Sequence, residues 1–181
     1  MNIVEEGARR LSPKRSHGRV INAIAAMLRQ RLSVPHIYFK PRLLGYSTLD
    51  VLAVDRAGSG DVHGVEIKVV SIVPSPASIK KLLVPLRSLP VHYKYLALNS
   101  RDIDINVLRK LANYPELFDD TGIGRVGIIA YDDRLLQADT TLNSDLTTLV
   151  VSPERFLVRD GKLTMLERFL VHAKPDMQVR M

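Results

Sequence analysis

Apolar residues recur every three or four positions between residues 17 and 32, and this spacing predicts an amphipathic helix. Ser16 is a good N-cap for it, and Ser33-Val34-Pro35 is expected to end it. The three arginines of this segment lie off the apolar stripe. The predicted stripe consists of Val20, Ile21, Ile24, Met27, Leu28 and Leu32.

The pattern then changes to one that is typical of β-strands. Residues 36–44 (HIYFKPRLL) predict a strand that Pro41 interrupts or confines to a sheet edge. Two further apolar runs, 48–55 and 61–70, flank a Gly-Ser-Gly turn at 58–60, which predicts a β-hairpin. This turn does not open a helix, so it is not a phosphate-binding loop.

The rest of the chain alternates between helical and strand patterns. Ser75-Pro76 predicts a helix start, and Pro85 should kink or shorten that helix. Strands are expected at 91–99, 125–132 and 134–139, and helices at 104–114, from Ser152-Pro153, and at 163–172. The sequence contains no internal repeat and no domain linker. It therefore predicts a single α/β domain over 1–181: a mixed central sheet with helices on both faces, a core at about 17–135, and a helical C-terminal extension at about 145–181.

Composition adds a few exclusions. The 181 residues include no cysteine, which excludes disulfides and thiolate chemistry. Neither an 18-residue apolar run nor a secretory signal is recognisable, so we expect a cytoplasmic protein without a membrane span.

Positive charge is concentrated at the N-terminus. Residues 1–42 hold nine basic and two acidic residues, which accounts for the whole net charge of +7. Such a region suits a polyanion such as nucleic acid, and a solvated basic tail is the alternative. The nine basic residues are Arg9, Arg10, Lys14, Arg15, Arg19, Arg29, Arg31, Lys40 and Arg42.

The predicted hairpin carries three charged residues among its apolar ones. If the turn is centred on Gly58, Asp50 lies opposite Glu66, and both share one face of the hairpin with Lys68. Leu49 then lies on the other, apolar face with Val51. Carboxylates about 5 Å apart repel each other unless a cation lies between them. Lys68 or a divalent metal such as Mg²⁺ would supply that cation.

These residues resemble the motif of the PD-(D/E)xK nuclease superfamily. The matching segments are Leu49-Asp50 and Glu66-Ile67-Lys68, and the helix-strand-strand-strand-helix-strand order of residues 17–98 fits the family core. The archaeal Holliday junction resolvase-like and restriction-endonuclease-like branches look nearest, and Gly18 and Ser47 can be placed on their pattern. Leu49 stands where the motif has proline.

The resemblance implies Mg²⁺-dependent (or Mn²⁺-dependent) hydrolysis of phosphodiester bonds in DNA, with Asp50, Glu66 and the Ile67 carbonyl as metal ligands. Lys68 would orient the attacking water or neutralise charge on the phosphate. The family has a glutamate in its first helix, and Asn22 stands at that position here. Either Glu5 or Glu6 would supply the third acidic residue instead, or the site has only two acidic residues. A homodimer would suit cleavage of two strands. The expected nucleic-acid contacts are Arg9, Arg10, Lys14, Arg15, Arg19, Ser47, Lys80 and Lys81.

Two other readings stay open. One is a nuclease-fold protein that binds nucleic acid or a protein partner without cleaving, and the other is an unrelated α/β protein with an incidental Glu-x-Lys. The five histidines show no metal-ligand spacing and are expected to be surface or packing residues. Asp132-Asp133 predicts a turn, and Tyr93 and Tyr95 predict packing on the sheet, with base stacking as the alternative.

Overall fold

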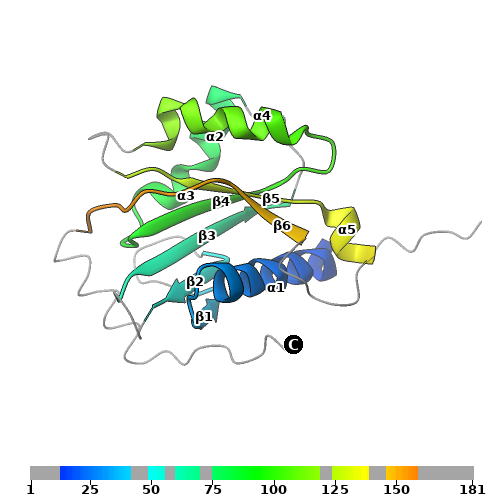
Figure 1. The fold of residues 1–181 in the computed structure, drawn as a ribbon, viewed down its shortest axis with the longest axis horizontal. Coiled ribbons are helices and arrows are strands. Elements are labelled where there is room, and N and C mark those ends of the chain that lie inside the picture. Colours follow the sequence, from blue (N-terminus) through cyan, green and yellow to red (C-terminus); the bar gives the residue numbers. More distant parts are fainter. Residues whose placement is uncertain are drawn as a thin grey trace, which may run out of the picture.

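A single six-stranded sheet forms the centre of the protein (Figure 1). The structure is a computed structural model that describes residues 13–41, 49–55, 60–69, 75–118, 124–138 and 146–158, without the side chains of 13–16 and 137–138. Spatial order follows chain order from β1 to β6. The strands are β1 (His36–Phe39), β2 (Val51–Val54), β3 (Val62–Lys68), β4 (Tyr93–Asn99), β5 (Gly127–Tyr131) and β6 (Thr147–Val151).

The sheet is mixed, as the sequence predicts. Strands β1, β2 and β3 pair antiparallel, β3, β4 and β5 pair parallel, and β6 returns antiparallel to β5. The two parallel connections carry helices, as crossovers between parallel strands require. The predicted α/β class is therefore confirmed.

Helices cover both faces of the sheet (Figure 1). One face is covered by α1 (Pro13–Arg31) and α5 (Asp133–Ala138). The other is covered by α2 (Pro76–Leu82), α3 (Val84–Arg87) and α4 (Ile105–Lys110), followed by the short 3-10 helices η1 (Leu111–Asn113) and η2 (Pro115–Leu117). None of these helices, within the described part of the chain, has the length and hydropathy that a membrane crossing needs.

The apolar stripe of α1 packs as the sequence predicts. Its residues join one core layer with the α1-facing side chains of the strands, among them Val51, Val65, Tyr95 and Ile129. The buried stripe comprises Val20, Ile21, Ile24, Met27 and Leu28, with Leu32 partly buried beside it.

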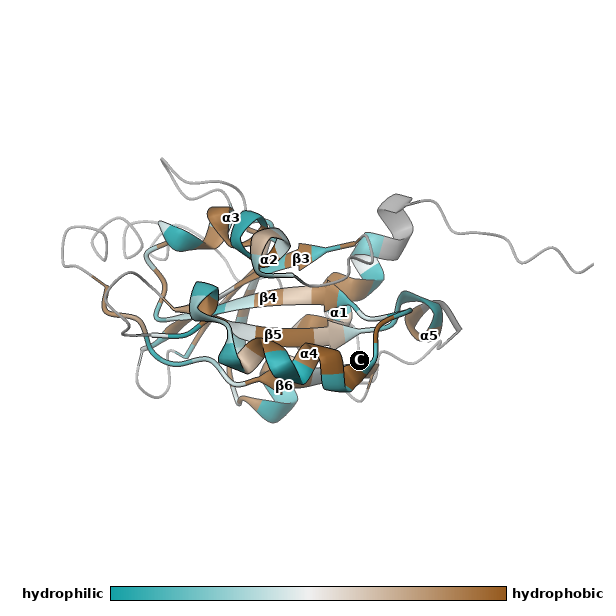
Figure 2. Ribbon diagram, turned by 90° about the horizontal axis from the view of Figure 1, so that it is seen from above, coloured by the Kyte–Doolittle hydropathy of each residue, from teal (hydrophilic) through white to brown (hydrophobic). Residues whose placement is uncertain are grey.

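The second core layer lies between the sheet and helices α2 to α4. Alternate residues of the same strands, such as Leu52, Leu96 and Ile128, face Ile79 and Leu108 there. Strands β4 and β5 are buried almost throughout because helices cover both of their faces. Figure 2, seen from the α2–α4 side, shows the resulting concentration of hydrophobic residues along β5.

The start of α2 follows its predicted capping chemistry. The Ser75 hydroxyl accepts a hydrogen bond from the Ser78 N–H, and the Ser78 hydroxyl accepts one from the Ser75 N–H. This reciprocal box satisfies two backbone donors at the helix start. Pro85 lies in the first turn of α3, so the predicted helix is interrupted there as expected.

Several boundary predictions are wrong. Helix α1 begins at Pro13, so Ser16 lies inside it and is not its N-cap. The expected strand at 134–139 is helix α5, because Asp132 accepts from the Arg134 N–H and turns the chain into a helix. The expected helix at Ser152-Pro153 has no regular structure, and the strand β6 just before it was not predicted. The predicted helix at 163–172 lies outside the described residues.

The two glycines Gly124 and Gly18 offer a matched stability test. Gly124 has φ of +89°, and a Cβ there would lie 2.8 Å from the Phe156 ring and 3.1 Å from its Cα. Gly124→Ala should therefore lower the free energy of unfolding by about 2 kcal/mol or more, measured by urea denaturation. Gly18 lies within α1 with open space around it, so Gly18→Ala should raise that free energy by roughly 0.5–1 kcal/mol. Equal effects would contradict this account of Gly124.

Candidate functional site

The predicted hairpin register is confirmed, but the chain leaves it at Asp50. Val51 pairs with Val65 and Val54 with Val62, which is the expected alignment. The Asp50 N–H, however, bonds to the Val65 carbonyl at 3.2 Å, one residue short of the partner that the register assigns. The regular pairing of β2 with β3 therefore starts only at Val51, whereas β3 itself continues beyond that pairing to Lys68.

This irregularity changes the faces that the sequence predicts around Asp50. Leu49 packs with Leu52 and lies 3.0 Å from the Cβ position of Gly64, so it belongs to the layer under α2 and α3. The prediction that Leu49 shares a face with Val51 is wrong, because strict alternation stops at Asp50. The prediction that Asp50 shares a face with Glu66 and Lys68 is wrong for the same reason. The β4 partners of Glu66 and Lys68 belong to the layer under α2 and α3, whereas Asp50 turns toward α1. The Asp50 carboxylate instead reaches His17 on α1, the helix of the opposite face.

Asp50 is held by two contacts. Its Oδ2 accepts the Ile67 N–H at 2.8 Å, and its Oδ1 lies 2.9 Å from His17 Nε2. Both side chains are mostly buried, with exposures of 16% for Asp50 and 20% for His17. The carboxylate therefore continues the β2–β3 ladder with a side-chain acceptor and ties the hairpin to α1.

Glu66 and Lys68 form the second part of the site. Lys68 Nζ donates to Glu66 Oε1 at 2.6 Å. Within the described part of the chain, Glu66 Oε2 is buried and has no hydrogen-bond partner. A buried, unpaired carboxylate oxygen is costly, so this atom favours a cation or a proton.

Electrostatics join the two parts. Burial raises the pKa of Glu66, the Lys68 ammonium lowers it, and the nearby Asp50 carboxylate raises it further, with a small opposing effect of His17. Asp50, Glu66, Lys68 and His17 therefore act on one another as a single polar cluster, which we call the hairpin site.

Two carboxylates suit Mg²⁺ when waters and a phosphate complete its shell. Glu66 Oε2, which has no hydrogen-bond partner among the described residues, keeps the lone pairs that such an ion would need, and Asp50 lies within electrostatic reach of it. A protein cage is not formed: among the described residues, no group of three or more His, Asp or Glu side chains is arranged to hold a metal. Ile67 lies next to the pair, and its expected role as a carbonyl ligand remains a prediction.

The third-acid position does not correspond to Asn22. His17 is the α1 residue that contacts Asp50. Asn22 follows five positions later, which turns it about 140° around the helix and moves it roughly 7.5 Å along the axis. Nothing in the sequence marks His17 for this contact other than its place near the helix start. Glu5 and Glu6 lie outside the described residues.

The predicted nucleic-acid contacts are only partly described. Arg19 donates to the Leu136 carbonyl at 3.0 Å and joins α1 to α5. Lys80 and Lys81 are exposed on α2, which covers the other face of the sheet. The described basic residues thus lie on both faces. Outside the described side chains are Arg9, Arg10, Lys14, Arg15 and Ser47.

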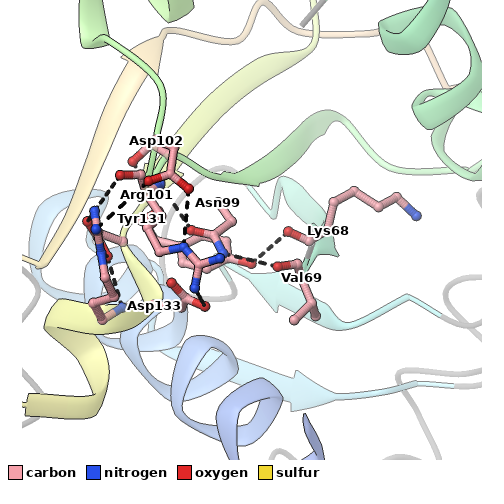
Figure 3. A network of polar contacts seen from close by, with 10 residues as sticks. Lys68, Val69, Asn99, Arg101, Asp102, Tyr131 and Asp133 are labelled. Atoms are coloured by element: carbon pink, nitrogen blue, oxygen red, sulfur yellow. Dashed lines mark hydrogen bonds and ion pairs between the residues drawn. The ribbon is translucent and has the colours of Figure 1, made fainter. Parts of the chain in front are cut away.

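A polar network fixes the carboxyl ends of the parallel strands beside the hairpin site (Figure 3). The Tyr131 hydroxyl donates to the Lys68 carbonyl at 2.6 Å, and Asn99 Nδ2 donates to the Val69 carbonyl at 3.1 Å. Burial raises the pKa of Tyr131, and the Asp133 and Asp50 carboxylates add to this. Tyr131 thus stays a neutral donor that anchors the end of β3. Arg101 Nη1 lies 3.6 Å from Asp133 Oδ2 in the same network.

A second polar cluster lies at the start of β3 and β4. His63 Nδ1 is 3.1 Å from the Tyr95 hydroxyl, and its ring stacks on Tyr93 with centroids 4.8 Å apart. Burial lowers the pKa of His63 to about 4, with a smaller opposing effect of Asp61. His63 and Tyr95 are buried and pack on the sheet, as predicted. The alternative that Tyr95 stacks on a base is therefore wrong, because its ring is buried within the protein.

Comparisons with known proteins add little to this picture. No family model matches the chain, and no curated protein matches it. A solved structure of a protein of unknown function from Silicibacter pomeroyi, SPO1766, is similar over 90% of this chain and 86% of its own, at 14% identity and a TM-score of 0.47. The YaeQ protein of Xanthomonas axonopodis pv. citri is similar over 82% and 84%, at 11% identity and a TM-score of 0.38.

Proposed function

We propose that the protein is a Mg²⁺-dependent endonuclease that hydrolyses phosphodiester bonds in DNA at the hairpin site. The observation that supports this most is the buried Oε2 of Glu66, which has no hydrogen-bond partner among the described residues and lies within electrostatic reach of Asp50. The neighbouring Lys68 ammonium completes the set of charges that the resemblance to PD-(D/E)xK nucleases implies.

Each residue of the site has a distinct part in this proposal. Asp50, fixed by the Ile67 N–H and by His17, is a rigid carboxylate. Glu66 supplies a buried oxygen to which none of the described residues is hydrogen-bonded, and Lys68 supplies a compact cation beside it. When bound, Mg²⁺ would polarise the scissile phosphate and lower the pKa of a water. Lys68 would stabilise the negative charge that develops on the phosphate or orient the attacking water.

The direct test is cleavage. The protein is incubated with Mg²⁺ or Mn²⁺ and with linear, circular, flapped and four-way-junction DNA, and products are resolved on denaturing gels. We expect metal-dependent nicking that EDTA abolishes, with branched DNA preferred if the enzyme is structure-specific. Absence of cleavage on every substrate and with either metal would overturn the enzymatic proposal.

A nuclease-fold protein that binds nucleic acid or a protein partner without cleaving is the second candidate. It is favoured by the His17–Asp50 contact, because His17 occupies a carboxylate oxygen that a metal would otherwise use. Under this alternative, the same DNA panel is bound in gel-shift assays but not cut, and added Mg²⁺ leaves the affinity unchanged.

The basic N-terminal segment should carry part of the DNA affinity. Replacing Arg9, Arg10, Lys14 and Arg15 by Gln should weaken binding to all DNA sequences alike. It should also reduce the slope of log K against log salt by roughly one unit for each phosphate that the protein no longer neutralises, measured by fluorescence anisotropy. The matched control neutralises Arg109 and Lys110, which are exposed on α4. A slope that changes only in the control would place the DNA on the α4 side instead.

A further inference from the structure

A cavity of about 100 Å³ lies on the α2–α4 face, away from the hairpin site. It is bordered by α3, η2, the start of β4, the residue before β5 and the segment after β6, and it is partly open to solvent. Its walls are mostly apolar. The apolar lining comprises Leu83, Leu86, Leu117, Phe118, Val126 and Phe156.

Two cationic side chains border this cavity. Lys94 is only 5% exposed, donates to the Arg87 carbonyl at 2.9 Å, and places its ammonium 4.4 Å from the centre of the Phe156 ring. The Arg87 side chain is exposed and lines the same cavity. A buried ammonium acts strongly on its surroundings because water screens it little. This side of the cavity is therefore suited to an anionic group.

Glu116 contributes the opposite charge. It lines the cavity, and its Oε2 is buried with no hydrogen-bond partner in the described part of the chain. An ionised carboxylate oxygen accepts hydrogen bonds only, so this atom is suited to an N–H or O–H donor, best a cationic one. The cavity thus combines an apolar body, a positive side and a buried carboxylate oxygen for which the described residues offer no hydrogen-bond donor.

We propose that this cavity binds a small zwitterion, an α-amino acid with a short branched aliphatic side chain. Its ammonium would donate to Glu116 Oε2, and its carboxylate would lie toward Lys94 and Arg87. The aliphatic group would pack against Leu86, Val126 and Phe156. An apolar cavity of about 150 Å³ holds benzene, so the three or four carbons of such a side chain suit the smaller volume here.

The affinity should be about millimolar, as befits a ligand of about eight non-hydrogen atoms in a partly open cavity. The experiment uses the full-length protein with labelled leucine and valine methyl groups, titrated with L-valine and followed by NMR. We expect saturable shifts at Leu83, Leu86 and Val126. Two analogues of valine test its two charged groups separately, because isovalerate lacks the ammonium and isobutylamine lacks the carboxylate. Each should bind at least about tenfold more weakly than valine.

Glu116→Gln tests the acceptor. It should weaken valine by roughly tenfold while leaving isovalerate unchanged or slightly improved, since the variant removes only a negative charge. Glu154→Gln, in a half-exposed glutamate that pairs with Arg125, is the matched control and should leave valine binding unaltered. The comparison of valine with isovalerate on the unmodified protein tests the same point without any substitution. The proposal is overturned if isovalerate binds as tightly as valine, or if no ligand shifts these methyl signals at 50 mM, roughly fifty times the expected Kd.

Discussion

Glu66→Gln should abolish DNA cleavage while leaving DNA binding intact. The substitution keeps the shape of the side chain and an oxygen that can accept from Lys68, but it removes the negative charge next to Asp50. Loss of an outer partner of a metal ligand costs about 10–100-fold, so loss of a proposed ligand should cost more than roughly 100-fold in the cleavage rate. Binding should persist because removing a carboxylate does not weaken the attraction to phosphate. Cleavage rates and anisotropy of the same labelled DNA measure the two effects.

Two controls make this result specific. Glu154→Gln changes a half-exposed glutamate that pairs with Arg125 and takes no part in the hairpin site, so this variant should cleave DNA at the rate of the unmodified protein. Urea denaturation of Glu66→Gln should show no loss of stability, because the variant removes a partly buried charge. A folded Glu66→Gln variant that still cleaves at full rate would remove Glu66 from the proposed site.

His63 should make the protein acid-labile between pH 6.5 and 4. The folded protein holds His63 neutral until about pH 4, whereas in the unfolded chain its pKa is 6.5. As pH falls through this window the unfolded chain takes up a proton that the folded state refuses, so the free energy of unfolding decreases. The full difference between the two pKa values corresponds to about 3 kcal/mol. Above pH 6.5 and below pH 4, His63 should add no further pH dependence.

Urea denaturation at a series of pH values measures this effect as a difference between variants. His63→Gln cannot titrate, so its stability should fall less than that of the unmodified protein between pH 6.5 and 4. His92→Gln is the companion variant, because burial also lowers the pKa of His92, which lies 3.7 Å from Asp61. Parallel curves for the unmodified protein and His63→Gln would show that another group causes any acid lability.

Local signals predict the first part of the fold well. The stripe of α1, the hairpin register, the capped start of α2 and the break at Pro85 each follow from a few adjacent residues. Predictions failed where longer-range contacts decide. The strand β6 pairs with β5 through a register shift near Ile128, and its sequence has no regular alternation of its own. The failure at residues 133–138 has a local cause instead, because the Asp132 carboxylate accepts the Arg134 N–H and starts a helix there.

The site shows the same division. Asp50, Glu66 and Lys68 could be selected because the hairpin brings them to the same end of two paired strands, although Asp50 does not follow the predicted alternation. The turn of Asp50 toward α1 could not, because it depends on the Ile67 N–H and on His17, which is 33 residues away in the chain. Tyr131 and Asp133 were likewise missed as neighbours of the site, since a parallel crossover places them there.

The separation of His17 and Asp50 along the chain also has a kinetic consequence. The β2–β3 hairpin is local and can form within microseconds, whereas the parallel pairings of β3, β4 and β5 require the closure of long loops. Docking of α1 on the sheet joins His17 to Asp50 across the β1–β2 region. The hairpin alone therefore carries Asp50, Glu66 and Lys68 early in folding, but Asp50 acquires its fixed orientation only when α1 docks. Refolding followed by stopped-flow fluorescence should show the folding rate falling little in His17→Ala, with the loss of stability appearing mainly as faster unfolding.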